Sequence, residues 1–419
     1  MRRTLSFSGS AAINWDAFRG CPSTLARRCG AADEWLIGVG ELDSSEVSDP
    51  GHGFTRLKAF LNGHGDWVFG HLAYGMGAEA EPGLATGKDP MGWPALRFFV
   101  PRFVVHWKPT GTLVHCTAGD EREAERLMAD ITAPAVHAPF PRFGDFTHVS
   151  RERYLQRAGQ FMSHIQRGDI YEVNYCIPRT GHAPGLDPFA AFGLMDAHLR
   201  APHAAFYRTD GRYALCESPE RFVCVQDRTI TGEPMKGTRP RHHDMDRDRA
   251  LAFELANDAK ERSENIMTVD VMRNDLSRVA APRSVRVDDL CQVRSLPALH
   301  QMTSTVRAGL REGLHAVDAI RSCFPMASMT GAPKKRAMEL IDALEDAPRG
   351  LYSGALGFFT PEGDADFNVV IRTLLFDERT SAISLTTGSA LTAACDPEKE
   401  WEECELKARS VLDALGHAG

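Results

Sequence analysis

Apolar residues recur at helical spacing in several separate segments of the chain. Between Arg151 and Gln166 they stand at Tyr154, Leu155, Ala158, Phe161, Met162 and Ile165, and Gly168 follows. Positions three and four residues apart share one face of a helix, so this pattern predicts a helix that ends before the glycine. Similar patterns predict helices at about 121–131, 188–199, 246–274, 334–344 and 397–415.

Shorter alternating or continuous apolar segments are typical of strands. They lie at 67–72, 96–100, 205–209, 213–216, 222–225 and 229–231. Near the C-terminus, 352–360, 366–376 and 382–387 predict three adjacent antiparallel strands, two of them joined by the turn residues 361–364. Strands that cluster between helices without regular βαβ alternation predict an α+β fold built on large antiparallel sheets.

A proline-rich segment interrupts these patterns at 133–147, where Pro134, Pro139 and Pro141 stand close together. Such segments commonly connect compact units. We therefore expect an N-terminal subdomain at 1–132, a connector at 133–147 and a larger domain at 148–416. In the first of these the patterns predict strands, loops and a single helix that closes it.

The 419-residue chain is 43% hydrophobic and 25% charged with a net charge of -8, which describes a globular protein. Its acidity argues against nucleic-acid binding, which requires a basic face. No uncharged apolar run is long enough to cross a bilayer, and none follows Met1 as in a signal peptide, so we expect a cytoplasmic protein. The ten cysteines form no CxxC pair and are expected to be reduced and mostly buried.

One lysine stands out chemically. Lys236 lies on a turn between Pro234-Met235 and Gly237-Thr238, and Arg239, Arg241 and His242 follow. Burial and neighbouring cations would lower the pKa of this amine and favour a base or nucleophile. A solvated basic loop is the simpler interpretation of the same residues.

Carboxylates on two predicted helices form a second candidate. Glu264 shares a helical stripe with apolar residues, and Glu403 shares one with Glu400 and Lys407. Most helix carboxylates face water, but a glutamate on an apolar stripe needs a partner. Two such glutamates from different helices would form a sparse oxygen site of the kind that holds Mg²⁺.

Further candidates stand in loops and strands. Glu220 precedes Lys236 by sixteen residues, and the two could act as a general acid with a base or nucleophile. The small-residue loop 324–334 and the segment 388–390 offer backbone N–H groups to a carboxylate. Arg372, within an apolar segment, must be paired or reach a site, and His300 and Tyr352 alone are equally consistent with satisfied core residues.

Together these stretches resemble the chorismate-utilising enzymes, which include anthranilate, aminodeoxychorismate, isochorismate and salicylate synthases. The resemblance covers about 149–415 and is looser before it, at DWVFGHLAYG (66–75). It rests on GDIYEVNY (168–175), SPERF (218–222), PMKGTRPR (234–241), KERSENIMTVDVMRNDLSRV (260–279), LHQMTSTV (299–306), FPMASMTGAPKKRAMELI (324–341), RGLYSGALGF (349–358), DFNVVIRT (366–373) and DPEKEWEECELKA (396–408).

The resemblance implies a large two-sheet antiparallel β-sandwich with flanking helices and an N-terminal part like that of anthranilate synthase component I. In that family anthranilate synthases have alanine where Lys236 stands, whereas the other three activities have lysine. The segment at 169–175 is similar to the ammonia-using members, so the chain is closest to component I of aminodeoxychorismate synthases. Isochorismate or salicylate synthesis, with Lys236 activating water, and an anthranilate synthase-like activity remain alternatives.

The resemblance also implies roles for single residues. Lys236, Glu220 and His300 would be catalytic, with Glu220 as the acid and His300 near the ring hydroxyl. Glu264 and Glu403 would bind Mg²⁺. The residues expected to bind chorismate are Thr238, Thr330, Tyr352, Arg372, Gly388, Ser389, Ala390 and Lys407.

Two departures from the family pattern concern this site. The pattern has glycine where Ala390 stands, so the segment after Gly388 gains a Cβ atom, and Met326 and Ala327 replace smaller residues. No cysteine-nucleophile motif for glutamine hydrolysis is present, so ammonia is expected from a separate glutamine amidotransferase subunit. A non-catalytic chorismate-binding subunit would lack part of the site, and none of these glutamates nor the lysine is missing.

Overall fold

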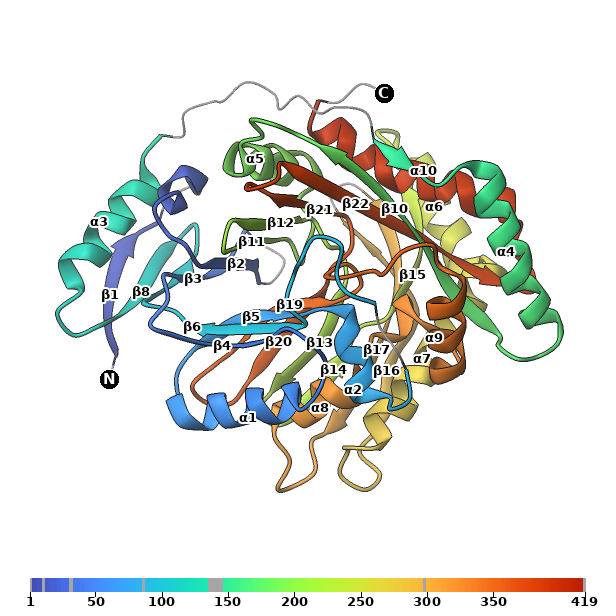
Figure 1. The fold of residues 1–419 in the computed structure, drawn as a ribbon, viewed down its shortest axis with the longest axis horizontal. Coiled ribbons are helices and arrows are strands. Elements are labelled where there is room, and N and C mark those ends of the chain that lie inside the picture. The colour runs from blue at the N-terminus through green and yellow to red at the C-terminus, as the bar shows by residue number, and fades with distance from the viewer. Residues whose placement is uncertain are drawn as a thin grey trace.

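The computed structural model describes residues 2–9, 12–29, 33–84, 87–134, 146–296 and 299–416. Two large antiparallel sheets form its body, and helices flank them (Figure 1). One sheet has 12 strands and the other has 10 among these residues. We call them sheet A and sheet B.

In sheet A, β1 lies at one edge and β18 at the other. Its strands in spatial order are β1 (Arg2–Ser8), β8 (Gly111–Thr117), β7 (Phe103–Trp107), β3 (Trp35–Val39), β2 (Thr24–Arg28), β11 (Ala205–Thr209), β12 (Arg212–Cys216), β21 (Thr373–Asp377), β22 (Ala382–Thr392), β10 (Glu172–His182) and β18 (Gly331–Ala332), with β9 (Thr147–His148) paired to β10.

Sheet B begins with the strand that carries Lys236. Its order is β15 (Met235–Pro240), β17 (Leu299–Gly309), β14 (Thr229–Gly232), β13 (Arg221–Gln226), β20 (Ala365–Val369), β19 (Ala355–Phe359), β5 (Val68–Leu72), β6 (Leu96–Val100) and β4 (Asp43–Val47), with β16 (Arg286–Ser295) paired to β17.

The helices begin at capping residues that the sequence supplies. Ser150, Asp187 and Asp396 each accept hydrogen bonds from the first turn of the helix that follows. The α-helices are α1 (Gly53–His64), α2 (Gly77–Ala80), α3 (Glu121–Thr132), α4 (Arg151–Gln166), α5 (Pro188–Leu199), α6 (Met245–Asn257), α7 (Ala259–Ser277), α8 (Ala316–Cys323), α9 (Lys334–Leu344) and α10 (Pro397–Ala414); η1 (Trp15–Phe18), η2 (Tyr74–Met76) and η3 (Ala327–Met329) are short 3₁₀ helices.

The hydrophobic core lies in layers. Phe69 of sheet B and Leu25 and Tyr207 of sheet A belong to one cluster between the sheets. A second cluster packs α3, α5 and α10 on sheet A, and a third packs α1, α7 and α8 on sheet B. Apolar burial on both faces of each sheet fits the continuous apolar runs in their strands.

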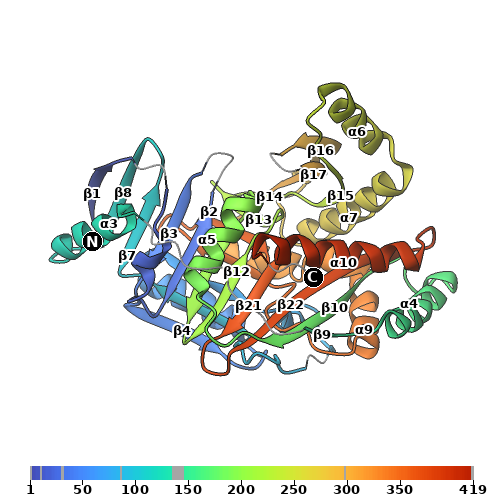
Figure 2. The same ribbon diagram turned by 90° about the horizontal axis from the view of Figure 1, so that it is seen from above.

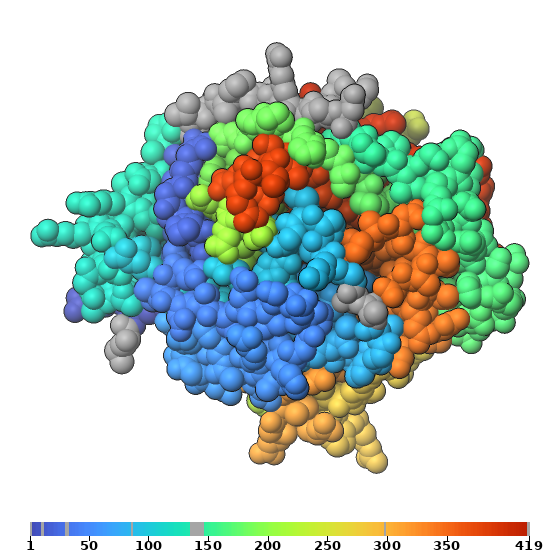
Figure 3. Space-filling model, viewed as in Figure 1, coloured from blue at the N-terminus to red at the C-terminus, as the bar shows by residue number. Residues whose placement is uncertain are grey.

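In both sheets, strands from the first 132 residues pair with strands that follow residue 146. β2 pairs with β11 in sheet A, and β5 pairs with β19 in sheet B. Early and late residues consequently lie side by side on one face (Figure 3). The proposed division into 1–132 and 148–416 stays a prediction, and most of the 133–147 connector lies outside the described residues.

Two predicted elements, and the expected place of one residue, are wrong in detail. The helix predicted at 246–274 is two helices, because Asp258 has an extended backbone and caps α7 through its side chain. The strand predicted at 366–376 is two strands, and β20 and β21 belong to different sheets. Arg372, with φ of 52°, lies in the break between them and not inside a strand.

The first 132 residues contain more helix than the single one predicted. α1 buries Phe54, Leu57 and Leu61 at helical spacing. No helix among the described residues combines the length and the apolar composition needed to cross a membrane. All ten cysteines are free, as expected, and six of them are buried.

Candidate active site

Lys236 links the two sheets. It is the second residue of β15, and its Nζ lies 2.5 Å from Oε1 of Glu172, the first residue of β10. Both side chains are nearly buried, with 10% of Lys236 and 5% of Glu172 exposed. The interpretation as a solvated basic loop is therefore wrong for this residue.

A glycine lets β15 pass close to the junction of α6 and α7. Gly237 has φ of 73° and forms a bulge between Lys236 and Thr238. A Cβ atom at Gly237 would lie 2.8 Å from Oε2 of Glu261 and 2.9 Å from Cδ1 of Leu255. Both the dihedral angle and the space thus require glycine after the lysine.

Carboxylates, not cations, surround the amine. Burial alone would lower the pKa of Lys236, but Glu172, Glu264 and Glu220 outweigh burial and raise the pKa. The expected lowering of this pKa is therefore wrong. Lys236 is an ammonium at neutral pH, and it becomes a nucleophile or base only when a neighbour takes a proton.

The two arginines after Lys236 point elsewhere. Arg239 pairs with Asp258 at 2.8 Å, and Arg241 pairs with Asp248 at 2.9 Å. Both acids belong to the α6–α7 segment. Arg239 and Arg241 consequently stabilise a neighbouring helix pair, and the charges that act on Lys236 come from carboxylates. Figure 2 shows α6 beyond β16, at the end of the molecule formed by this part of sheet B.

Glu220 is suited to hold a proton near neutral pH. It is 5% exposed, in the turn before β13. Burial raises its pKa to about 7, against the opposing effects of the Ser328 hydroxyl and the Lys236 ammonium. A carboxyl group with such a pKa is partly protonated at neutral pH and can act as a general acid.

Glu264 presents an unsatisfied oxygen to the same region. Its Oε1 is buried without a hydrogen-bond partner, and burial raises its pKa to about 7 although Lys236 and Lys260 oppose the shift. Lys260 lies 3.7 Å from that oxygen and pairs at 2.7 Å with Glu400 of α10. A buried acceptor without a donor suits a cation.

Glu403 lies on α10 in the same field of charges. Burial would raise its pKa, but Lys407, at 2.6 Å, together with Lys260 and Lys236, lowers it. Within the described ranges no group of three or more His, Cys, Asp or Glu side chains could hold a metal. A metal between Glu264 and Glu403 would therefore need oxygens from a ligand or water.

The segments expected to bind carboxylates converge on β10. Gly388, Ser389 and Ala390 of β22 pair with Cys176, Tyr175 and Asn174 of β10. Gly388 has no space for a side chain, because a Cβ atom there would lie 2.6 Å from Oδ1 of Asn174. Lys407 donates to the Gly388 carbonyl at 2.8 Å, so it holds this segment and does not point away from it.

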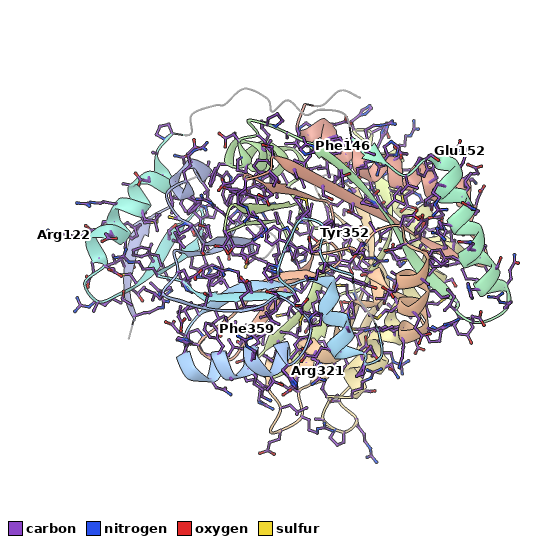
Figure 4. All side chains as sticks on the ribbon, in the orientation of Figure 1. Arg122, Phe146, Glu152, Arg321, Tyr352 and Phe359 are labelled. Carbon is purple, nitrogen blue, oxygen red and sulfur yellow. The ribbon has the colours of Figure 1, made fainter. Side chains whose placement is uncertain are left out.

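Thr330 and Tyr352 are buried, Tyr352 in the interior of the molecule (Figure 4), and Arg372 is half-buried. Burial lowers the pKa of Arg372, and Tyr352 and Glu403 oppose the shift, so this guanidinium lies within electrostatic reach of both the tyrosine and α10. It donates to Ser410 of α10 at 3.3 Å. Because Ser410 is an uncharged partner, the positive charge of Arg372 remains available to an anion.

His300 has partners of its own. One ring nitrogen pairs with Asp248 at 3.0 Å and the other with Ser295 at 2.9 Å. It lies on the face of β17 that also buries Met302 against Leu255 of α6. These contacts give His300 a structural role in seating α6, and its expected place near the substrate ring stays a prediction. Thr238 is exposed at the bulge.

Sequence reasoning missed Glu172, Lys260 and Gln301. Glu172 is a charged residue that begins an apolar strand, which was a signal for a paired or functional group. Gln301 lies on the face of β17 opposite His300, and its Oε1 is buried without a partner. Only the structure shows which of His300 and Gln301 faces the site, because adjacent residues of a strand point to opposite faces.

The family follows from these residues and the chain around them. Residues 41–413 match the family of chorismate binding enzymes. The chain belongs to this family. Lys236, Glu264 and Glu403 all lie within the matched region.

Relatives with several activities resemble this member of the family. An aminodeoxychorismate synthase of Streptomyces pristinaespiralis is 42% identical over 71% of this chain and 43% of the relative. Aminodeoxychorismate synthase component 1 of Escherichia coli K12 is 39% identical over 64% of this chain and 59% of the relative. Anthranilate synthase component 1 of Thermus thermophilus is 32% identical over 86% and 81%. The chain thus spans about half the length of the first two.

Solved structures share the fold. Anthranilate synthase component I from Streptococcus pneumoniae has a TM-score of 0.77, with 22% identity over 98% of this chain and 92% of that chain. The menaquinone-specific isochorismate synthase from Escherichia coli has a TM-score of 0.79, with 18% identity over 99% and 95%. The predicted α+β fold of two antiparallel sheets with flanking helices is confirmed.

Proposed function

We propose that this chain is an aminodeoxychorismate synthase component I, which converts chorismate and ammonia to 4-amino-4-deoxychorismate. The observation that carries the proposal is the buried amine of Lys236 among Glu172, Glu220 and Glu264. Such a group supplies an amine, an acceptor for its proton and an acid of suitable pKa within one site. Relatives named aminodeoxychorismate synthase, at 39–42% identity, support the choice among the family's activities.

Two displacements would carry out the reaction. Glu172 takes a proton from the Lys236 ammonium, and the neutral amine attacks C2 of chorismate while Glu220 protonates the C4 hydroxyl, which leaves as water. Ammonia then forms a bond to C4, and the bond between C2 and Lys236 breaks. Glu172 then returns its proton to Lys236, and the ammonium formed at C4 gives a proton to the Glu220 carboxylate, so chorismate and ammonia yield the amino product and water.

Mg²⁺ is the proposed metal, and Glu264 and Glu403 would hold it. The unpartnered Oε1 of Glu264 supports this placement, as does the preference of Mg²⁺ for few carboxylates with water and ligand oxygens. When bound, the metal supplies positive charge for a substrate carboxylate. The substrate's carboxylates would be oriented beside the metal by Thr330, Arg372 and the N–H groups of Gly388–Ala390.

Ammonia would come from a separate glutamine amidotransferase chain. The similar protein of Escherichia coli is named component 1, which supports a two-component enzyme. We therefore expect that ammonium salts alone sustain the reaction in vitro and that glutamine does so only with the second chain.

One observation favours an alternative. The raised pKa of Lys236 and its pairing with Glu172 also suit an amine that only transfers protons, as in the activation of water at C2. That chemistry would give isochorismate or salicylate. The test is mass detection of the product formed from chorismate, Mg²⁺ and ammonium: a product without nitrogen contradicts the amination proposal, and one aminated at C2 would assign anthranilate chemistry.

A further inference from the structure

We infer that Arg349 and Glu345 are positioning residues for chorismate, because together they fix both backbone segments expected to bind its carboxylates. Glu345 ends α9, and Arg349 follows four residues later. Their side chains are 5% and 1% exposed and pair at 2.7 Å. We call them the 345–349 clasp.

Arg349 uses all five of its N–H groups. Nε and Nη2 donate to the two oxygens of Glu345 at 2.9 and 2.7 Å. Nη2 also donates to the carbonyl of Asn174 at 2.8 Å, and Nη1 donates to the carbonyl of Met329 at 2.5 Å and to Ser353 Oγ at 3.3 Å. A guanidinium satisfied in this way is rigid, because each bond restricts the direction of the others.

The clasp completes an edge of sheet A. β18 pairs only with Glu172 and Val173 of β10. Beyond that point the carbonyl of Asn174 accepts from Arg349, and the N–H of Cys176 donates to Oε1 of Glu345 at 2.8 Å. Two side chains thus replace a neighbouring strand. On its other edge the same part of β10 pairs with Gly388–Ala390, so the clasp sets the position of that segment.

The same guanidinium reaches the second segment. Met329 directly precedes Thr330, and Ser353 directly follows Tyr352. The carbonyl and hydroxyl that Arg349 holds therefore adjoin two more residues expected to bind substrate. One buried side chain fixes the spacing between Thr330, Tyr352 and Gly388–Ala390, and errors of about 1 Å in such spacing cost binding or rate.

An open cavity leads to the clasp. It has a volume of about 640 Å³, and Arg349 and Glu345 line it with Tyr74, Trp93 and Asp342. The Arg349 guanidinium lies 4.7 Å above the ring of Tyr74. A small cation that enters this cavity can consequently take the place of a truncated Arg349 side chain.

The first test compares two Arg→Lys substitutions. Lysine keeps the charge but places its donors on one atom, so Arg349→Lys cannot hold Asn174, Met329 and Glu345 together. Arg28→Lys is the matched control: Arg28 is buried and pairs with Asp196 at 2.5 Å and with the Ala201 carbonyl at 2.8 Å, where β2 meets α5. Both variants should lose thermal stability. Only Arg349→Lys should raise the KM for chorismate, by about tenfold, with a smaller change in kcat.

The second test is chemical rescue. Arg349→Ala should lose most chorismate affinity, and guanidinium at millimolar concentration should restore it several-fold, whereas methylammonium should restore less. An unchanged KM for Arg349→Lys, or equal KM changes in the Arg28 and Arg349 variants, would overturn the inference. So would a complete absence of rescue in folded Arg349→Ala.

The inference rests on chorismate as the substrate and does not depend on the position that is aminated. KM is therefore measured as consumption of chorismate, whatever the product. Failure of the amination proposal would appear in the wild-type product. Failure of the inference on the 345–349 clasp would appear in the variants, as an unchanged KM in Arg349→Lys, equal KM changes in the Arg28 and Arg349 variants, or no rescue of Arg349→Ala.

Discussion

Replacing Glu172 by glutamine tests how Lys236 loses its proton. Lys236 and Glu172 are 2.5 Å apart and nearly buried. A hydrogen bond to a charged group contributes about 1.5–3 kcal/mol, and about 1.4 kcal/mol corresponds to one pKa unit. Glu172→Gln should therefore destabilise the Lys236 ammonium by about 1.5–3 kcal/mol and lower the pKa of Lys236, while Glu264 and Glu220 still favour the ammonium.

The two possible roles of Glu172 predict opposite changes in kcat when the residue is replaced by glutamine. If Glu172 only keeps the lysine protonated, its removal releases the amine and raises the rate at pH 7.5. If it is the proton acceptor, as proposed, kcat at that pH should fall by about 10²-fold or more, the usual worth of a positioned base. KM for chorismate should change little.

The assay is chorismate consumption with saturating ammonium and Mg²⁺ between pH 6 and 10. In Glu172→Gln, kcat should recover partly as pH rises, because the lowered pKa of Lys236 then lets solvent take the proton. A variant that equals or exceeds the wild type at pH 7.5 would refute the assignment of Glu172 as acceptor. Glu254→Gln, an exposed residue of α6, is the control and should retain the wild-type profile.

Three further predictions concern the same site. Burial raises the pKa of Glu220 to about 7, above its unfolded value near 4.5, so the wild type loses stability as pH rises from 4.5 to 7. In Glu220→Gln, Tm should therefore fall less over this pH range. The same substitution should reduce kcat by about 10²-fold or more and remove the decline of kcat above pH 7. Glu264→Gln should increase the Mg²⁺ concentration for half-maximal activity by about tenfold in a titration, with no change in Glu254→Gln; an unchanged requirement would remove Glu264 as a ligand. Gly237→Ala should lower the free energy of unfolding, measured with denaturant, by about 1–2 kcal/mol, because alanine would take a left-handed backbone and contact Glu261. It should also lower kcat, because Lys236 shifts. Wild-type values of both would contradict the close approach of β15 to α7.

Local signals predicted the helices well where caps and breakers stand in sequence. α4 has the predicted bounds, because Ser150 caps its start and Gly168 ends its pattern. The two strands β20 and β21 were merged, because nothing local marks the positive φ of Arg372 or the crossing from one sheet to the other. α1 was not predicted, although the helical spacing of its apolar residues is present in the sequence.

The environment of Lys236 could not be predicted from its neighbours in sequence. Arg239 and Arg241 suggested a cationic setting, but both reach acids of the α6–α7 segment. The carboxylates that decide its pKa come from β10, the turn before β13 and α7, and only long-range packing brings them together. The same is true of the 345–349 clasp, whose importance lies in backbone atoms far away in sequence.

The central claim is that this site joins nitrogen to C4 of chorismate through Lys236. Its most direct test is mass spectrometry and NMR of the product made from chorismate, Mg²⁺ and isotopically labelled ammonium by the wild type and by Lys236→Ala. The account predicts one labelled nitrogen at C4 in the wild-type product and none with the variant. A wild-type product without label, or equal amination by Lys236→Ala, would contradict it.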